Sequence, residues 1–114
     1  MSEDPVLTNP DHYSVVFEND HVRVLEYVDQ PGDRTTMHAH PDSVMYTLSS
    51  FRRRLYSEDG RSRDVELSSG TAGWLPAQRH AGHNVGPGET HVIFVELKQP
   101  RPAAEAALGP TTRS

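Results

Sequence analysis

Histidines are the side chains in this sequence whose type and spacing point most directly to chemistry. The chain contains seven, and His38 and His40 stand two residues apart. Residues two apart on an extended strand point to the same face, so these imidazoles lie close enough to share one ion. His80 comes later in the chain and joins them if its segment lies beside theirs. We therefore predict a metal site with three neutral imidazole ligands; the alternative is that His38 and His40 are surface histidines at the end of a strand.

Two more side chains lie near these histidines in the sequence. His83 is a candidate fourth ligand, and the alternative is a solvent-exposed position or a place behind the ligands. Asp42 either reaches the ion, orients a ring by accepting its second N–H, or caps the loop, and we favour the cap. Three histidines have no such spacing and are expected on the surface: His12, His21 and His91.

The elements that must position these side chains are predicted to be short strands. Strand-like runs alternate with turn residues, and no long stretch has a helical period. The expected strands are 13–17, 21–28, 43–48, 51–57, 63–67, 71–75 and 91–98. The pair Asp59-Gly60 between two alternating runs is typical of a tight hairpin. Evenly spaced short strands in a chain of 114 residues indicate an all-β sandwich, jelly roll or small barrel.

The chain is predicted to form one domain with an extension at each end. Two hydrophobic cores would each be too small to fold in 114 residues. The domain is expected over residues 13–98. Residues 1–12 are polar, carry two prolines and are expected to form an N-terminal arm. Residues 99–114 are rich in Ala and Pro and are expected to form a flexible C-terminal tail.

Composition excludes several classes of partner and chemistry. The formal net charge is −5, with 16 acidic against 11 basic residues, so nucleic acid and anionic lipid are not expected partners. The sequence has no cysteine, which excludes disulfides and thiolate sites, so a transition metal must be held by His, Asp or Glu. There is no secretory signal at the start and no apolar run of membrane-spanning length, so we expect a cytoplasmic location.

The first histidine segment resembles the first motif of the cupin superfamily. That motif opens with a glycine, five residues and His-x-His, and Gly32 with His38 and His40 keeps this spacing without a gap. The family's glutamate ligand is absent, because the two permitted positions hold Val44 and Met45. The closing glycine of the motif is also missing.

A later segment resembles the second cupin motif. That motif runs glycine, five residues, proline, a short turn, histidine, three residues and asparagine, and Gly70, Pro76, His80 and Asn84 keep the frame. The glycine between proline and histidine is replaced by Gln78. The resemblance covers roughly residues 20–98 and is similar to small one-domain bacterial cupins. It implies a jelly-roll barrel that brings the three histidines together, with open positions as in catalytic sites.

Two polar residues are candidates for proton transfer. Alternation places Val44 and Tyr46 on one face of a strand, and Phe94 and Glu96 on one face of another. If these faces line the barrel, Tyr46 and Glu96 are the catalytic polar groups of an otherwise apolar pocket. Glu96 is then the candidate general base, and the alternative is an outward-facing Glu96 paired to a neighbouring strand.

Arg53 and Trp74 complete the predicted substrate pocket beside Val44 and Phe94. Arg53 could present its guanidinium to an anionic substrate, and the alternative is a solvated or dimer-contacting strand. For Trp74 the alternative to a ligand contact is a place in the core.

These residues favour a metal-dependent cupin that acts on a small, anionic organic molecule. The ion could be Zn, Fe, Ni, Mn or Cu, and the reaction a lyase, isomerase, cyclase or dioxygenase reaction. The alternatives are a non-catalytic ligand- or metal-binding module, and a metal-free dehydratase or isomerase that uses the histidines as acid and base. Exposed sheet edges in so short a chain also predict a homodimer, joined by strand pairing or sheet packing.

Overall fold

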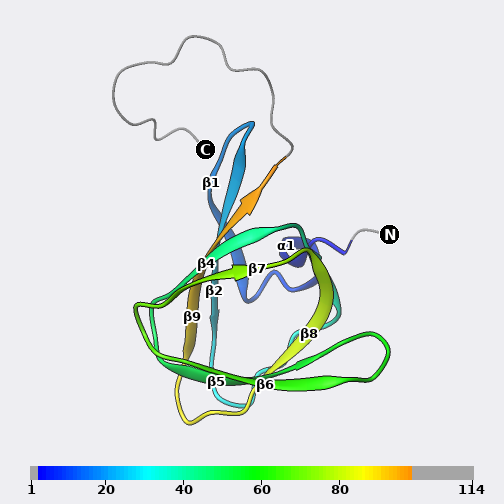
Figure 1. The fold of residues 1–114 in the computed structure, drawn as a ribbon, viewed down its shortest axis with the longest axis vertical. Coiled ribbons are helices and arrows are strands. Elements are labelled where there is room, and N and C mark those ends of the chain that lie inside the picture. The colour runs from blue at the N-terminus through cyan, green and yellow to red at the C-terminus, as the bar shows by residue number, and fades with distance from the viewer. Residues whose placement is uncertain (1–2, 99–114) are drawn as a thin grey trace.

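The computed structural model describes residues 3–98, which form two antiparallel sheets and one short helix (Figure 1). The all-β prediction is therefore confirmed. The elements in chain order are α1 (Pro5–Thr8), β1 (Tyr13–Glu18), β2 (Val22–Asp29), β3 (His38–His40), β4 (Ser43–Thr47), β5 (Phe51–Tyr56), β6 (Ser62–Leu67), β7 (Ala72–Leu75), β8 (Gln78–Asn84) and β9 (Thr90–Leu97).

The two sheets face each other around the core. One has the strand order β1-β2-β9-β4-β7 and the other β3-β8-β5-β6. Residues alternate between the two faces of each strand, and β2 and β9 point their buried side chains inward at every second position. The buried hydrophobic cluster is Tyr13, Leu25, Tyr27, Phe51, Val92 and Phe94. These aromatic and aliphatic side chains form the hydrophobic core of the jelly roll.

Two strands were not among the seven runs expected from the sequence. One is β3, which the histidine spacing had suggested only as an extended segment. The other is β8, whose sequence Gln-Arg-His-Ala-Gly-His-Asn has little apolar alternation and few strongly strand-forming residues. It is a strand because its backbone pairs with β3 on one side and β5 on the other. The expected Asp59-Gly60 hairpin joins β5 to β6, with Gly60 at φ 90°.

The segment before β1 packs against the strand that carries two of the histidines. The backbone N–H of Ala39 donates to the carbonyl of Glu3 over 2.9 Å. The side chain of Asn9 accepts a 2.9 Å hydrogen bond from the backbone N–H of Thr36. Residues 3–12 therefore brace β3, which the expectation of an arm did not include. The expected C-terminal tail, 99–114, lies outside the described residues.

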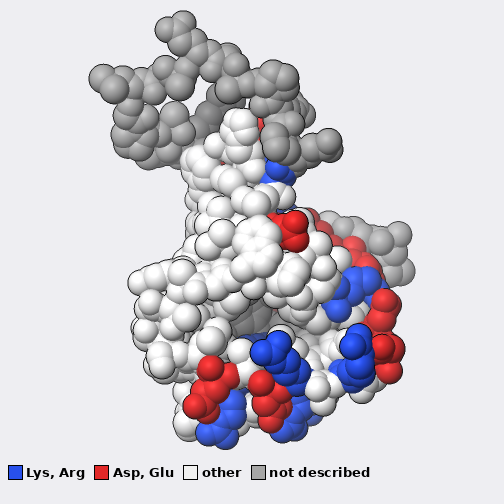
Figure 2. All heavy atoms as spheres, viewed as in Figure 1, with Lys and Arg blue, Asp and Glu red and all other residues white. Residues whose placement is uncertain are grey.

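An apolar row crosses the outer face of the five-stranded sheet. Each strand contributes one residue, and each is the direct partner of the next: Phe17, Val24, Val95, Val44 and Trp74. Figure 2 shows most of the charged side chains at the lower and right edges of the described surface, while the surface over β4 and β7 is largely uncharged. Among the described residues no helix is long and apolar enough to cross a membrane.

Candidate metal site and its cavity

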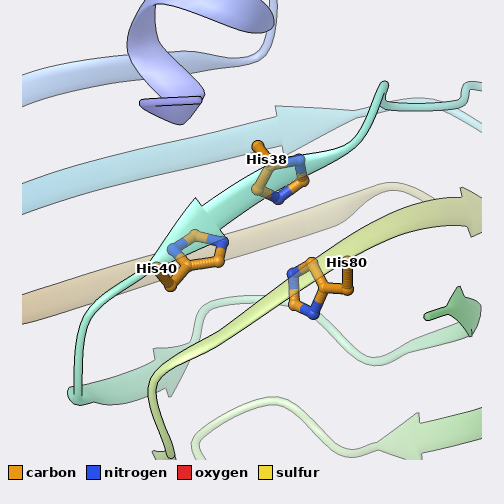
Figure 3. Close-up of side chains that lie close together, drawn as sticks. All are labelled: His38, His40 and His80. Atoms are coloured by element: carbon orange, nitrogen blue, oxygen red, sulfur yellow. The ribbon is translucent and has the colours of Figure 1, made fainter. Parts of the chain in front are cut away.

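Three histidines from neighbouring strands converge at one point (Figure 3). His38 and His80 are direct partners in the antiparallel pair of β3 and β8, and His40 lies two residues further along β3. Their candidate ligand atoms all lie within 4.8 Å of one another. The rings are buried, with 1%, 3% and 8% of His38, His40 and His80 exposed. The structure thus brings together the three residues that the sequence nominated as metal ligands.

A hydrogen bond behind each ring fixes which nitrogen faces the centre. Each Nδ1 lies against an oxygen that accepts a hydrogen bond, so Nδ1 carries the proton and Nε2 keeps a free lone pair. The partners are the Thr36 carbonyl for His38 (2.7 Å), the Glu96 carboxylate for His40 (3.3 Å) and the Gln78 side-chain oxygen for His80 (2.8 Å). Three lone pairs at one site are the donor set that a transition-metal ion requires. The residues present therefore fit such an ion.

Burial keeps two of these rings neutral at physiological pH. It lowers the pKa of His38 to about 4, against the opposing effect of the hydrogen bond to Thr36. It also lowers the pKa of His80 to about 3, and the neighbouring rings of His40 and His38 add repulsion between charges. Neutral imidazole is the form that binds metal, so no proton has to leave these two rings first.

Tyr13 is a site residue that the sequence analysis missed. Its hydroxyl oxygen lies 3.3 Å from Nε2 of both His38 and His40. Burial raises the pKa of this phenol well above its usual value. Tyr13 belongs to no motif and comes at the start of the first strand, so its sequence position carries no signal of a site. It reaches the histidines only because β1 lies across the barrel from β3.

Glu96 lies behind the site instead of in the cavity. The side chain is almost fully buried, and its second oxygen accepts a 2.9 Å hydrogen bond from Nε of Arg23. Arg23 in turn donates to Asp4, at 2.7 and 2.9 Å. A chain of polar contacts therefore runs from Asp4 through Arg23 and Glu96 to His40. Glu96 is not among the residues that line the cavity, and its contacts with His40 and Arg23 place it behind the histidine ring.

A cavity of about 370 Å³ adjoins the histidines. Tyr13, His38 and His80 form part of its wall, and residues of the edge strands β6 and β7 form another part. Most of the remaining wall is apolar, including Met45, Phe51, Leu67, Leu75, Val92 and Phe94. The described wall contains two arginines, Arg53 and Arg63, and no Asp or Glu. This volume suits a small organic molecule with an apolar body.

Several solved structures have a fold similar to that of this chain. A cupin domain from Bordetella pertussis Tohama I has a TM-score of 0.70 and 26% identity, over 76% of this chain and 92% of that one. The chain belongs to the cupin superfamily. A conserved protein with a double-stranded β-helix domain from Klebsiella pneumoniae has a TM-score of 0.59 and 24% identity, covering 75% and 74% of the two chains.

One structure with a similar fold is that of a named enzyme. The polyketide cyclase RemF from Streptomyces resistomycificus has a TM-score of 0.56 and 18% identity, over 85% of this chain and 71% of RemF. At that identity the likeness concerns the fold alone. Neither a protein-family model nor a curated protein sequence matches the chain.

The position of the missing cupin glutamate lies on β4. The side chains of this strand alternate between the inner and outer faces in the opposite phase to the one expected. Val44 and Tyr46 are exposed, at 41% and 46%, and do not line the cavity. Met45 points inward instead, between the buried small polar residues Ser43 and Thr47. The inner positions are polar and satisfied locally, as in the 2.7 Å hydrogen bond from Thr47 to the Ser68 carbonyl. The expectation that Val44 and Tyr46 face the interior of this cupin is wrong.

Arg53 lies in the cavity wall, held within a buried polar network. Its Nη1 donates to Asp29 over 2.5 Å and to Thr90 over 3.3 Å, and its Nη2 donates to the Tyr27 hydroxyl over 3.1 Å. Asp29 offsets the charge of Arg53, so this arginine contributes directed N–H groups more than net charge. Gly82 on β8 leaves room for the guanidinium.

The remaining candidates lie at the margin of the site. Phe94 lines the cavity and stacks on His40, with ring centroids 5.3 Å apart. Trp74 is 55% exposed and contributes to the cavity rim from the outer row. Asp42 caps the loop by accepting a 2.8 Å hydrogen bond from the N–H of Ala77. His83 is outside the three-histidine group.

Proposed function

We propose that this cupin binds a divalent transition-metal ion through His38, His40 and His80 and acts on a small, anionic organic molecule in the adjoining cavity. The observation that carries the proposal is the set of three Nε2 lone pairs, fixed by hydrogen bonds behind the rings and turned to one point. Such an ion supplies Lewis acidity, which stabilises negative charge on a bound oxygen. Lyase, isomerase and cyclase reactions use that property, whereas a dioxygenase reaction also requires a redox-active ion such as Fe²⁺.

The charge around the cavity supports an anionic ligand. Three neutral imidazoles leave the charge of a divalent ion uncompensated. Arg53 and Arg63 lie in the wall, and the described wall has no carboxylate to repel an anion. A cationic ligand would find no carboxylate in the described wall to pair with.

The chain's own residues have separate tasks in this proposal. Glu96, Thr36 and Gln78 hold the three rings in one orientation. Phe94 and its apolar neighbours exclude water and pack on the body of the ligand. Arg53 directs N–H groups at a polar end of the ligand, in the position set by Asp29.

Metal titration of protein purified without a histidine tag tests the ligand set. Isothermal titration calorimetry with Zn²⁺ and with Fe²⁺ under anaerobic conditions should give one ion per chain. His80→Ala should weaken this binding strongly, because it removes one of the three imidazole ligands. His21→Ala removes an exposed histidine outside the group and should leave binding unchanged. Equal binding by wild type and His80→Ala would rule out the proposed site.

A matched series of probes tests the charge preference. Benzoate, benzamide and benzylamine share a ring and differ in charge. In the zinc-loaded protein benzoate should raise the melting temperature, and benzylamine should not. An equal response to all three would contradict the anionic preference and leave the metal site intact.

A further inference from the structure

The hydroxyl of Tyr13 lies beside His38 and His40, at a place for which the cupin motifs specify no residue. The glutamate expected from β4 is absent, and Met45 stands at the inward position. Tyr13 Oη lies 3.3 Å from Nε2 of His38 and equally far from Nε2 of His40. Within the described residues, 3–98, Tyr13 is the tyrosine whose ring and hydroxyl contact these histidines.

Hydrogen bonding alone accounts poorly for this position. Both Nε2 atoms are acceptors, because their Nδ1 atoms already carry the protons. Tyr13 has a single hydroxyl proton and can satisfy one of them at a time. A distance of 3.3 Å is also long for an O–H donor, whose usual range ends near about 3.0 Å. The phenol lies between two lone pairs without a strong bond to either.

The same distances fit two ligands of one ion. Ligands about 2.0 to 2.1 Å from a tetrahedral metal ion lie about 3.3 Å from each other. The Oη of Tyr13 has that separation from both ligand nitrogens of β3. These separations are therefore compatible with one ion bound to His38, His40 and the phenol oxygen.

Packing holds Tyr13 in this place. It is 5% exposed, and its ring lies 4.6 Å from the ring of Tyr27, its direct partner on β2. Its backbone N–H donates to the carbonyl of Asn9 over 3.1 Å. The same Asn9 is hydrogen-bonded to Thr36, whose carbonyl orients His38. Tyr13 and His38 are thus positioned by one shared framework.

We propose that Tyr13 is the fourth protein ligand of this centre, its phenolate replacing the missing glutamate. The inference rests on the proposed metal site. On coordination the phenol oxygen forms a bond to the ion, the O–H bond breaks and the proton passes to solvent water. The ion's charge overcomes the effect of burial, as it does for other coordinated protic groups. The net charge of a divalent centre falls from +2 to +1, so a monoanion becomes the preferred ligand class.

Ultraviolet difference spectroscopy detects the phenolate directly. Zn²⁺ titrated into the wild-type protein should produce one tyrosinate absorption change per ion, although the chain has four tyrosines. With Cu²⁺ a visible charge-transfer band from phenolate to metal should appear. Tyr13→Phe should remove both signals and weaken Zn²⁺ binding at least tenfold. Tyr46→Phe changes an exposed tyrosine outside the cavity and should keep both signals.

The outcomes separate this inference from the proposed function. If wild type binds zinc without a tyrosinate signal and Tyr13→Phe binds it equally well, Tyr13 is not a ligand and the three-histidine site stands. If wild type binds no metal, the proposed function and this inference fail together. Should Tyr13→Phe not fold, the wild-type spectrum alone decides, since a ligand phenolate must absorb.

Discussion

An oxygen of the Glu96 carboxylate lies 3.3 Å from Nδ1 of His40, and both side chains are almost fully buried. This contact fixes the tautomer of His40 and adds negative charge behind a metal ligand. Partners of this kind commonly change metal affinity ten- to hundredfold when removed.

Glu96→Gln should therefore weaken Zn²⁺ binding roughly ten- to hundredfold while the fold persists. The amide keeps the shape of the side chain and loses the charge that holds both His40 and Arg23. Competition with a chromogenic chelator measures the affinity. Glu66→Gln, which changes an exposed carboxylate paired to Arg52, is the control. An unchanged affinity in Glu96→Gln would refute the role assigned to this carboxylate.

The phase of β4 predicts opposite results for two neighbouring substitutions. From the sequence, Val44→Glu should restore the missing ligand, but Val44 points to the outer face, so this variant should leave metal affinity unchanged. Met45→Glu places a carboxylate on the inner face and should tighten Zn²⁺ binding by about tenfold or more. The same chelator competition compares them. Tighter binding by Val44→Glu than by Met45→Glu would contradict the observed phase.

The metal-free protein should lose stability as the pH falls from about 6.5 towards 4. The folded-state pKa values of His38 and His80, about 4 and about 3, lie below the usual 6.5. Between these pH values His38 and His80 bind protons in the unfolded chain but not in the folded chain. The free energy of unfolding therefore decreases with falling pH. The total loss should be on the order of a few kcal/mol.

Urea denaturation at pH 7.5, 6 and 5 measures this loss. The carboxylate of Asp4 does not contribute in the same range, because hydrogen bonding to Arg23 lowers its pKa from 3.8. Bound zinc should reduce the dependence, and the low pKa values of His38 and His80 should let the ion persist below pH 6, the value expected from ordinary imidazoles. A flat stability profile of the metal-free protein between pH 7.5 and 5 would show that these rings are not buried as described.

Gly82→Ala should destabilise the protein by about 1 to 3 kcal/mol. A Cβ at this position would lie 2.5 Å from Nη2 of Arg53, which is held by Asp29 and Tyr27 and cannot easily withdraw. Thermal unfolding monitored by circular dichroism measures the change. Gly88→Ala, where a Cβ meets nothing within 4 Å, should be close to neutral. Equal effects of the two substitutions would show that Arg53 is free to move.

The apolar row on the outer sheet face predicts a homodimer in which two copies pack through this face. Val44 and Trp74 end the row and are 41% and 55% exposed. Sedimentation at micromolar concentration should give the mass of two chains, and Trp74→Glu should give one. Leu7→Glu adds the same charge at an exposed apolar residue on α1, outside the row, and should leave the dimer intact. A monomeric wild type would remove this prediction.

Sequence reasoning succeeded where spacing along the chain carries spatial information. His38 and His40 share a face because they are two apart on a strand, and the motif frame brought in His80. It failed on β4 because apolar residues were assigned to the inside, whereas Ser43 and Thr47 take inner positions that local hydrogen bonds satisfy.

Long-range contacts account for the other omissions. Tyr13 meets the histidines only through the pairing of β1 with β2 and the closure of the two sheets, which no local pattern encodes. β8 is extended because β3 and β5 pair with it, although its own residues favour a loop.

The register that sets His38 opposite His80 also bears on the order of events in folding. These strands are about 40 residues apart in the chain. The entropy cost of closing so long a loop must be met before the contact can stabilise the chain. We therefore expect the three nitrogens to come together late, after most of the apolar surface is buried. An ion that needs all three cannot guide the early steps, and we expect it to leave the folding rate nearly unchanged. Bound metal should instead slow unfolding, and so lengthen the lifetime of the folded chain.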